Sequence, residues 1–357
     1  MMKSLQRILA VGILLSVASI AQAAVDLRDD HPNVYYVKKG DTLWDISGRF
    51  LENPWQWPEL WHDNPDIDNP HLIYPGDEIR LSWVNGEPRL TVNRDDVAKT
   101  RMPDGTVKLS PRVRELDRDS AIPVIPMSAI QSYLKEGLVV EREDIRDAPY
   151  LVGGQDRRVV FGMGDTVYAR DPGAHWENIE RRYGVYRVGE EYVDPETDEV
   201  LGYEARQVAL GAVLDHEEDM ATVELVRSGE DVRVDDRLFS QPDRKVRAVL
   251  YPHAPDEKVT GRIIRFFDRI NSVARNDVVV INRGEREGME PGHVLEVYQE
   301  GELVRDRQRD EMVRLPRIKT GTLVLFRVFD KVSYGLVMSS TRPIYMEDLV
   351  ESPAGSY

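Results

Sequence analysis

Residues 34–83 constrain this 357-residue chain most, because strand, turn and helix signals follow one another closely there. Tyr35–Lys38 has the alternation of a strand, and Gly40-Asp41 follows as a turn. Thr42 is placed to cap a helix, and Asp45 three residues later completes a capping box. The residues that continue this helix at helical spacing are Leu43, Ile46, Ser47 and Phe50. The stretch therefore opens as a strand, a tight turn and a capped helix.

A second helix and a closing strand complete this unit. We predict a helix over Trp55–His62, bounded by Asn53-Pro54 and Asn64-Pro65, because proline interrupts a helical backbone. Pro75-Gly76-Asp77 then turns the chain into a last strand at Glu78–Leu81. The order strand, helix, helix, strand predicts a small α+β domain over residues 34–83.

The residues that carry this pattern resemble a LysM domain at both ends and at the centre. They are Val37–Ile46, Asn64-Pro65 and Leu72–Ile79, in that order and at suitable spacing. The departure is a longer, tryptophan-rich stretch at Asn53–Trp61, which leaves the motif intact. LysM domains bind the N-acetylglucosamine units of peptidoglycan or chitin, so the resemblance implies a glycan groove between two loops. The groove residues that it implies are Gly40, Asp41, Thr42, Leu43, Trp44, Asp66, Ile67, Leu72, Ile73 and Tyr74.

Turn-rich loops suit a sugar N-acetyl group, which needs an amide donor, a carbonyl acceptor and an apolar seat for its methyl. The same residues also have structural roles that require no sugar. Gly40 and Gly76 serve the turns, and Thr42 and Asp45 cap the helix. Three tryptophans are expected in the core rather than on a sugar platform: Trp44, Trp57 and Trp61.

The first 23 residues have the layout of a secretory signal peptide. Lys3 and Arg7 precede an uncharged, mostly apolar run at Ile8–Ile20, and Ala21–Ala23 offers a cleavage site. The run is too short for the roughly 20 residues that span a bilayer. We therefore expect secretion, cleavage before Ala24 and, in a bacterial cell, a periplasmic, wall-associated protein.

Charge and composition remove several classes of function. With 47 Lys+Arg against 63 Asp+Glu, the formal net charge is −16, which disfavours nucleic-acid binding. Cysteine is absent, so thiolate metal sites and cysteine nucleophiles are excluded. The seven histidines form no H-x-H or H-E-x-x-H motif, so we predict no metal site and no cofactor. We expect no enzyme and no catalytic residues, although 63 acidic residues leave a carboxylate-only hydrolase site open.

The rest of the chain is predicted to be mainly β. Residues 84–154 are expected to be a linker with one short helix at Pro126–Leu134, and Asp194–Glu199 is a clear turn between two strands. A fixed offset of 112 residues relates Asp165–Arg170 to Asp277–Asn282 and Val185–Glu190 to Val297–Glu302. We therefore predict two copies of one β-module, over 155–242 and 262–352. The fold class is α+β, a βααβ LysM unit followed by this duplicated β region.

The overall layout is similar to the secretin-associated LysM proteins of type IV pilus systems, whose C-terminal part looks like that of a flagellar T-ring assembly protein. The residues that carry this likeness are Asn282–Gly284, Gly288–Leu295 and Phe326–Tyr334. The resemblance implies a non-enzymatic anchor that grips peptidoglycan and associates with an outer-membrane secretin. Because one groove binds weakly, a homo-oligomer or a multimeric partner would have to supply avidity. Two alternatives remain open: a LysM envelope protein with another partner, and a LysM-targeted peptidoglycan hydrolase.

Overall fold

A computed structural model describes most of the chain. It covers residues 25–61, 73–84, 86–93, 97–101, 107–111, 121–155, 158–173, 176, 182–240, 250–267 and 271–354. The predicted signal peptide, 1–23, lies outside these residues. Within the described ranges, none of the helices has the length and apolar character needed to cross a bilayer.

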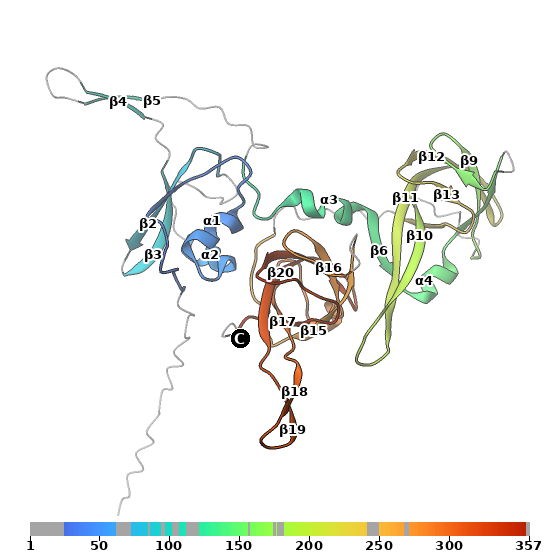
Figure 1. Ribbon diagram of the computed structural model, residues 1–357. Helices are drawn as coiled ribbons and strands as arrows, with labels where there is room; N and C mark the ends of the chain where they lie inside the picture. The colour runs from blue at the N-terminus through green and yellow to red at the C-terminus, as the bar shows by residue number, and fades with distance from the viewer. Residues whose placement is uncertain are drawn as a thin grey trace, which may run out of the picture.

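The N-terminal unit is a small sheet with two helices packed against it (Figure 1). Strand β1 (Val34–Tyr36) pairs antiparallel with β2 (Glu78–Val84), so that Tyr35 lies opposite Ile79. The helices are α1 (Leu43–Phe50) and α2 (Trp57–Trp61), joined by a short 3-10 turn, η1 (Pro54–Gln56). The predicted order strand, helix, helix, strand is confirmed for this unit.

The core of this unit consists of apolar side chains from both helices and from the sheet. Its most deeply buried members are Leu43, Ile46, Phe50, Leu51, Trp57, Leu60, Ile73 and Ile79. Burying a large apolar side chain contributes about 1.5–3 kcal/mol. The spacing of Leu43, Ile46 and Phe50 on α1 therefore fixes which face of that helix turns inward.

Several strands lie within the stretch predicted to be a linker. β3 (Glu87–Asn93) pairs with β2 and extends the N-terminal sheet, and β4 (Val97–Arg101) pairs with β5 (Val107–Pro111). Helix α3 (Met127–Glu136) stands where the short helix was predicted and leads into β6 (Gly137–Val140), helix α4 (Arg142–Asp147) and β7 (Tyr150–Gly154). The linker boundary at 154 is therefore too late.

The misplaced boundary has a local cause at β7. Gly153-Gly154 looks like the boundary of an element in the sequence. In the structure Gly154 lies within β7, against the aromatic ring of Phe161. A Cβ on Gly154 would lie 2.2 Å from a ring carbon of Phe161, so the close approach of that ring requires glycine. β7 pairs with β9 (Thr166–Arg170) and therefore belongs to the first β region.

The first β region continues with β8 (Val160–Phe161), β10 (Arg182–Val193), β11 (Val200–Glu217), β12 (Met220–Ser228), β13 (Val232–Arg233) and β14 (Arg237–Ser240). Its main sheet has the order β10-β14-β7-β9-β12-β11-β6, and β10 also pairs with β11. Six strands therefore close into a ring, and β6 adds to β11 from outside. The predicted turn at Asp194–Glu199 is confirmed as the tip of the β10–β11 hairpin.

The second β region is a closed barrel with the order β15-β16-β21-β20-β17-β22. Its strands are β15 (Thr260–Phe266), β16 (Val278–Ile281), β17 (Val294–Gln299), β20 (Ile318–Val328), β21 (Ser333–Ser340) and β22 (Leu349–Glu351). A 3-10 turn, η4 (Glu285–Glu287), precedes β17, and a hairpin of β18 (Leu303–Asp306) and β19 (Glu311–Arg314) projects from the barrel (Figure 1).

The two β regions have the same cyclic strand order. When β7, β9, β10, β11, β12 and β14 are matched in turn to β15, β16, β17, β20, β21 and β22, every neighbour in the first ring has its counterpart in the barrel. β9 and β16 lie about 112 residues apart in the sequence, and so do β14 and β22. This separation equals the offset between the matching stretches of sequence.

Candidate functional site

The candidate site begins at the N-terminus of α1. Thr42 has extended backbone angles as the N-cap, and its side-chain oxygen accepts from the Asp45 amide at 3.1 Å. The Asp45 carboxylate in turn accepts from the Thr42 hydroxyl at 2.8 Å. Asp45 therefore reaches back to the hydroxyl and not, as a full capping box would, to the Thr42 amide. This pair fixes where α1 starts.

The turn before α1 is held by Asp41. One of its carboxylate oxygens accepts from the Tyr35 hydroxyl and from the Lys38 amide, each at 2.8 Å. Burial, together with the bond to Asp41, raises the pKa of Tyr35. Gly40 has a φ of 95°, a left-handed conformation that a side chain would strain. The loop is therefore shaped by the sequence immediately around it.

A second turn, at Tyr74–Asp77, lies beside the first. The Tyr74 amide donates to the Asp77 carboxylate at 3.0 Å, and Gly76 has a φ of 96°. Val37 links the two turns, because its carbonyl accepts from the Gly76 amide at 2.8 Å and its amide donates to the Asp77 carbonyl at 2.9 Å. The turn that follows the second predicted loop therefore lies beside the first loop.

The predicted groove residues fall into three groups. Gly40 is exposed and Asp41 is half-buried. The buried ones, each with no more than 6% of its surface exposed, are Thr42, Leu43, Trp44, Ile73 and Tyr74. Those that lie outside the described residues are Asp66, Ile67 and Leu72. The structure thus brings the first loop and the end of the second together.

Residues 121–126, which we call the covering segment, lie against both of these loops. The Leu43 amide donates to the Pro123 carbonyl at 3.0 Å, and the Trp44 amide donates to the Val124 carbonyl at 3.2 Å. On the other side, the Ile122 amide donates to the Ile73 carbonyl at 2.8 Å. Backbone groups of the two loops that were expected to bind a sugar are therefore bonded to the chain itself.

The covering segment was not predicted, although its sequence contains a signal for burial. Ala121–Pro126 is an apolar run with two prolines, and it follows the charged stretch at 112–120. Such a run is unusual in a solvated linker. Its apolar side chains predict burial, but nothing in the chain order says against which surface.

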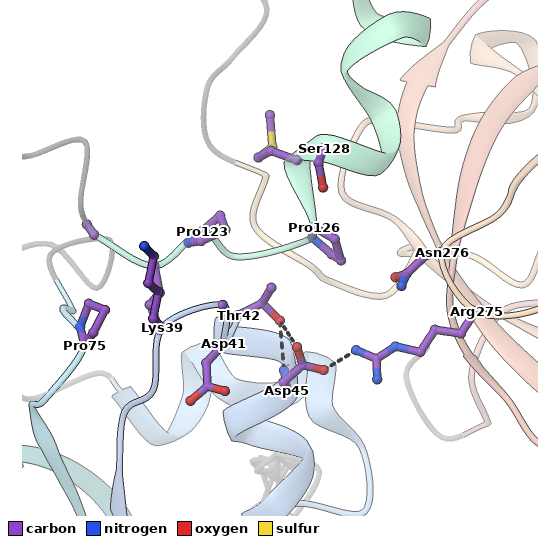
Figure 2. A pocket seen from close by; sticks show the side chains of 14 residues that line it. Lys39, Asp41, Thr42, Asp45, Pro75, Pro123, Pro126, Ser128, Arg275 and Asn276 are labelled. Atoms are coloured by element: carbon purple, nitrogen blue, oxygen red, sulfur yellow. Dashed lines mark hydrogen bonds and ion pairs between the residues drawn. The ribbon is translucent and has the colours of Figure 1, made fainter.

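A cavity of about 810 Å³ lies between the first loop, the covering segment and a loop of the barrel (Figure 2). Lys39, Asp41 and Thr42 line one side, and Pro123 and Pro126 line another. It is completed by Arg275 and Asn276, which precede β16, and Arg275 forms an ion pair with Asp45 (Figure 2). Asp41 and Thr42, two of the predicted site residues, therefore line a cavity that the barrel helps to enclose.

The tryptophans of this region are mainly structural. Trp44, Trp57 and Trp61 are buried, as predicted, with 3%, 1% and 6% of their surfaces exposed. The Trp57 ring stacks on Tyr251 with a centroid distance of 6.3 Å, so it also joins the N-terminal unit to the chain before the barrel. Trp83 is 62% exposed on β2 and is available to a partner or ligand.

The structure also brings two histidines together that the sequence separates by 40 positions. The His253 and His293 rings meet edge to face at 4.7 Å, beside Glu290. Nδ1 of His293 accepts from the Glu290 amide at 3.1 Å, and Nδ1 of His253 donates to the Tyr251 carbonyl at 2.8 Å. His293 therefore carries its proton on Nε2 and has no free lone pair for a metal in this arrangement. The two rings pack against each other, and each is held by a hydrogen bond to a backbone group.

The N-terminal unit is similar to known proteins. A LysM domain family model matches residues 35–82. A stretch of 60 residues is 37% identical to part of an uncharacterized protein, YqbP, of Bacillus subtilis (strain 168), and the match covers 14% of this chain and 27% of that protein. The chain thus spans about a quarter of that relative's length. LysM is a binding domain, and LysM domains bind peptidoglycan through its N-acetylglucosamine polymers. Residues 35–82 of this chain are therefore a LysM domain.

Proposed function

We propose that this protein is a non-enzymatic periplasmic anchor, delivered by a cleaved signal peptide, which binds peptidoglycan and holds an outer-membrane secretin complex of the type IV pilus kind to the cell wall. The LysM domain supports the carbohydrate-binding half of this proposal. The secretin half rests on the resemblance of the whole layout and of the β-rich remainder to that family.

One observation carries the binding half of the proposal. The two groove loops present the amides of Leu43 and Trp44 and the carbonyl of Ile73 to the backbone of residues 122–124. The N-acetyl group of N-acetylglucosamine contains the same amide N–H and C=O groups as a peptide. Loops that pair with a peptide backbone in this way therefore have the donors and the acceptor that such a sugar requires.

A single groove would hold the wall only weakly. A millimolar dissociation constant corresponds to about −4 kcal/mol, so useful anchoring requires several grooves held together. A ring-shaped secretin, or an oligomer of this chain, would bring the grooves together. The two β regions are the parts of the chain that have no other assigned role, so we assign the partner interaction to them.

We also propose that the two β regions are copies of one module. Their equal cyclic strand order and the 112-residue sequence offset support this relation. The module bounds then begin near Tyr150 and Thr260, because β7 and β15 are matching strands. Such a pair gives the chain two related surfaces for assembly.

Carbohydrate binding is tested by sedimentation of the full chain with purified peptidoglycan. Soluble N-acetylglucosamine pentamer should compete and release the protein, and maltopentaose, which has no N-acetyl group, should not. Sedimentation that the pentamer leaves unchanged would place binding outside the LysM groove.

The secretin partner is tested by crosslinking in cells followed by identification of the crosslinked protein. We expect the secretin in the crosslinked product. Recovery of a different envelope protein would favour a general LysM role, and peptidoglycan cleavage by the purified chain in a zymogram would favour a hydrolase.

A further inference from the structure

The covering segment is bonded to the backbone groups that the proposed function offers to a glycan. It occupies the amides of Leu43 and Trp44 and the carbonyl of Ile73, at 3.0, 3.2 and 2.8 Å. Each amide has a single hydrogen to donate. A sugar N-acetyl group that used these two donors would therefore have to replace the covering segment.

The side chains of the covering segment are built into the core. Ile122, Val124 and Ile125 have 4%, 6% and 1% of their surfaces exposed, and Pro123 between them is exposed. The three buried residues belong to the same apolar cluster as Leu43, Trp44 and Ile73 of the LysM domain. The segment is therefore held by buried apolar contacts as well as by its three hydrogen bonds.

The barrel holds the covering segment in place through α3. This helix begins one residue after the segment, and its Ile130 is fully buried. At its end, the Tyr133 carbonyl accepts from Arg327 of β20 at 2.7 Å, and the Tyr133 ring packs against Phe267 at a centroid distance of 4.9 Å. The barrel also reaches the LysM domain directly, through the ion pair between Arg275 and Asp45 (Figure 2).

We propose that the covering segment autoinhibits the LysM groove, and that glycan binding is coupled to its release and to the docking of the barrel. This inference rests on the proposed carbohydrate binding. The apparent affinity for glycan is then the affinity of the open arrangement multiplied by the fraction of molecules that are open. Because coupling is reciprocal, a partner that draws the barrel or α3 away from the LysM domain raises its affinity for the wall, and a bound glycan favours that partner.

The first test uses the full chain with Ile122→Asp, because an aspartate cannot be buried in an apolar cluster and should expel the segment. Val160→Asp is the matched control, since Val160 lies on β8 with 40% of its surface exposed. Binding of N-acetylglucosamine pentamer is measured by calorimetry, with circular dichroism to verify folding. We expect the dissociation constant to fall by about tenfold or more in Ile122→Asp only.

Each outcome of this test decides a different point. Equal dissociation constants for the wild type and both variants overturn autoinhibition and leave carbohydrate binding standing. No binding by any of the three overturns the proposed carbohydrate binding, and the autoinhibition that rests on it.

A second variant guards against misfolding of Ile122→Asp. The chain has no cysteine, so Val124→Cys introduces a single thiol that the closed arrangement buries. A thiol reagent should label it slowly, and saturating pentamer should accelerate labelling by about tenfold or more as the segment leaves. An unchanged labelling rate while calorimetry detects bound pentamer overturns the proposal.

Discussion

At the residue scale, short-range hydrogen bonds set the shape of the groove loops. Thr42 and Asp45 bond to each other across the first turn of α1, and Asp41 accepts from Tyr35 and Lys38. The two residues of each bonded pair lie within six positions of each other, which is why the sequence could place both the turn and the cap. The loop is consequently formed before any glycan arrives.

Replacement of Thr42 by alanine should destabilise the LysM domain. The change removes the side-chain acceptor of the Asp45 amide, and loss of such a cap costs about 1 kcal/mol. Urea unfolding followed by tryptophan fluorescence measures the effect. Thr42→Ser keeps the hydroxyl and should retain most of the stability, and equal losses in both variants would contradict a capping role.

His293 gives stability a dependence on pH. Burial, and then the nearby His253, lowers the pKa of His293, although Glu290 and Asp256 act in the opposite direction. An unfolded histidine has a pKa of about 6.5, so below that pH the unfolded chain binds a proton that the folded chain does not. The free energy of unfolding should therefore fall as the pH drops below about 6.5, and level off below the native pKa.

The check is urea unfolding at pH 7.5 and 5.5. His293→Gln should lose part of the difference between the two values, and His216→Gln, at an exposed position, should keep it. An unaltered difference in His293→Gln would assign the pH dependence to other groups.

At the element scale, the β10–β11 hairpin joins the two β regions. Its turn places Asp194, which is 5% exposed, against Asn282 of the barrel, and the Asn282 side-chain amide donates to the carboxylate at 2.9 Å. Burial acts to raise the pKa of Asp194, but donors that include the Glu196 amide and Asn282 outweigh it, and the net pKa is lowered. The turn was predictable from its residues, whereas its docking partner lies 88 positions away.

Loss of the Asn282 donor should loosen this joint. Asn282→Ala leaves the buried Asp194 carboxylate with fewer donors, and a hydrogen bond to a charged group contributes about 1.5–3 kcal/mol. We expect a loss of about that size in urea unfolding. Glu199→Ala removes the half-exposed pairs that the same turn makes with Arg286 and Lys331 of the barrel, and it should cost less than about 1 kcal/mol. Equal costs would show that the buried bond contributes no more to the joint than these exposed pairs.

At the scale of the whole molecule, one apolar cluster joins the LysM domain to the barrel, whose interior forms a second cluster. Trp57 of the LysM domain, Ile125 of the covering segment, Ile130 of α3 and Val280 of β16 belong to a single cluster. The interior of the first β region, with Val167, forms a separate cluster. Tyr192 and Leu201 of the β10–β11 hairpin also belong to the shared cluster. A cavity in this cluster should therefore destabilise the LysM domain, whereas a cavity in the interior of the first β region should not.

This division is testable with the tryptophans as reporters. In a Trp176→Phe background all remaining tryptophans lie in residues 44–83, so fluorescence reports on the LysM domain. Val280→Ala should lower the urea midpoint of that signal, since a cavity in the shared core costs about 2 kcal/mol. Val167→Ala removes the same two methyl groups from the separate cluster and should leave the midpoint unchanged. Equal shifts in both variants would argue for a single unfolding unit.

The sequence by itself determined the LysM domain, its capped helix, its two glycine turns and the β-rich character of the remainder. These features depend on neighbouring residues and on periodicity, which the chain order displays directly. The tertiary structure alone decided that residues 121–126 bond to Leu43, Trp44 and Ile73, that the barrel contacts α3 and that β7 belongs to a ring. The apolar composition of a segment such as Ala121–Pro126 predicts that it is buried. Which surface buries it depends on contacts between residues far apart in the chain.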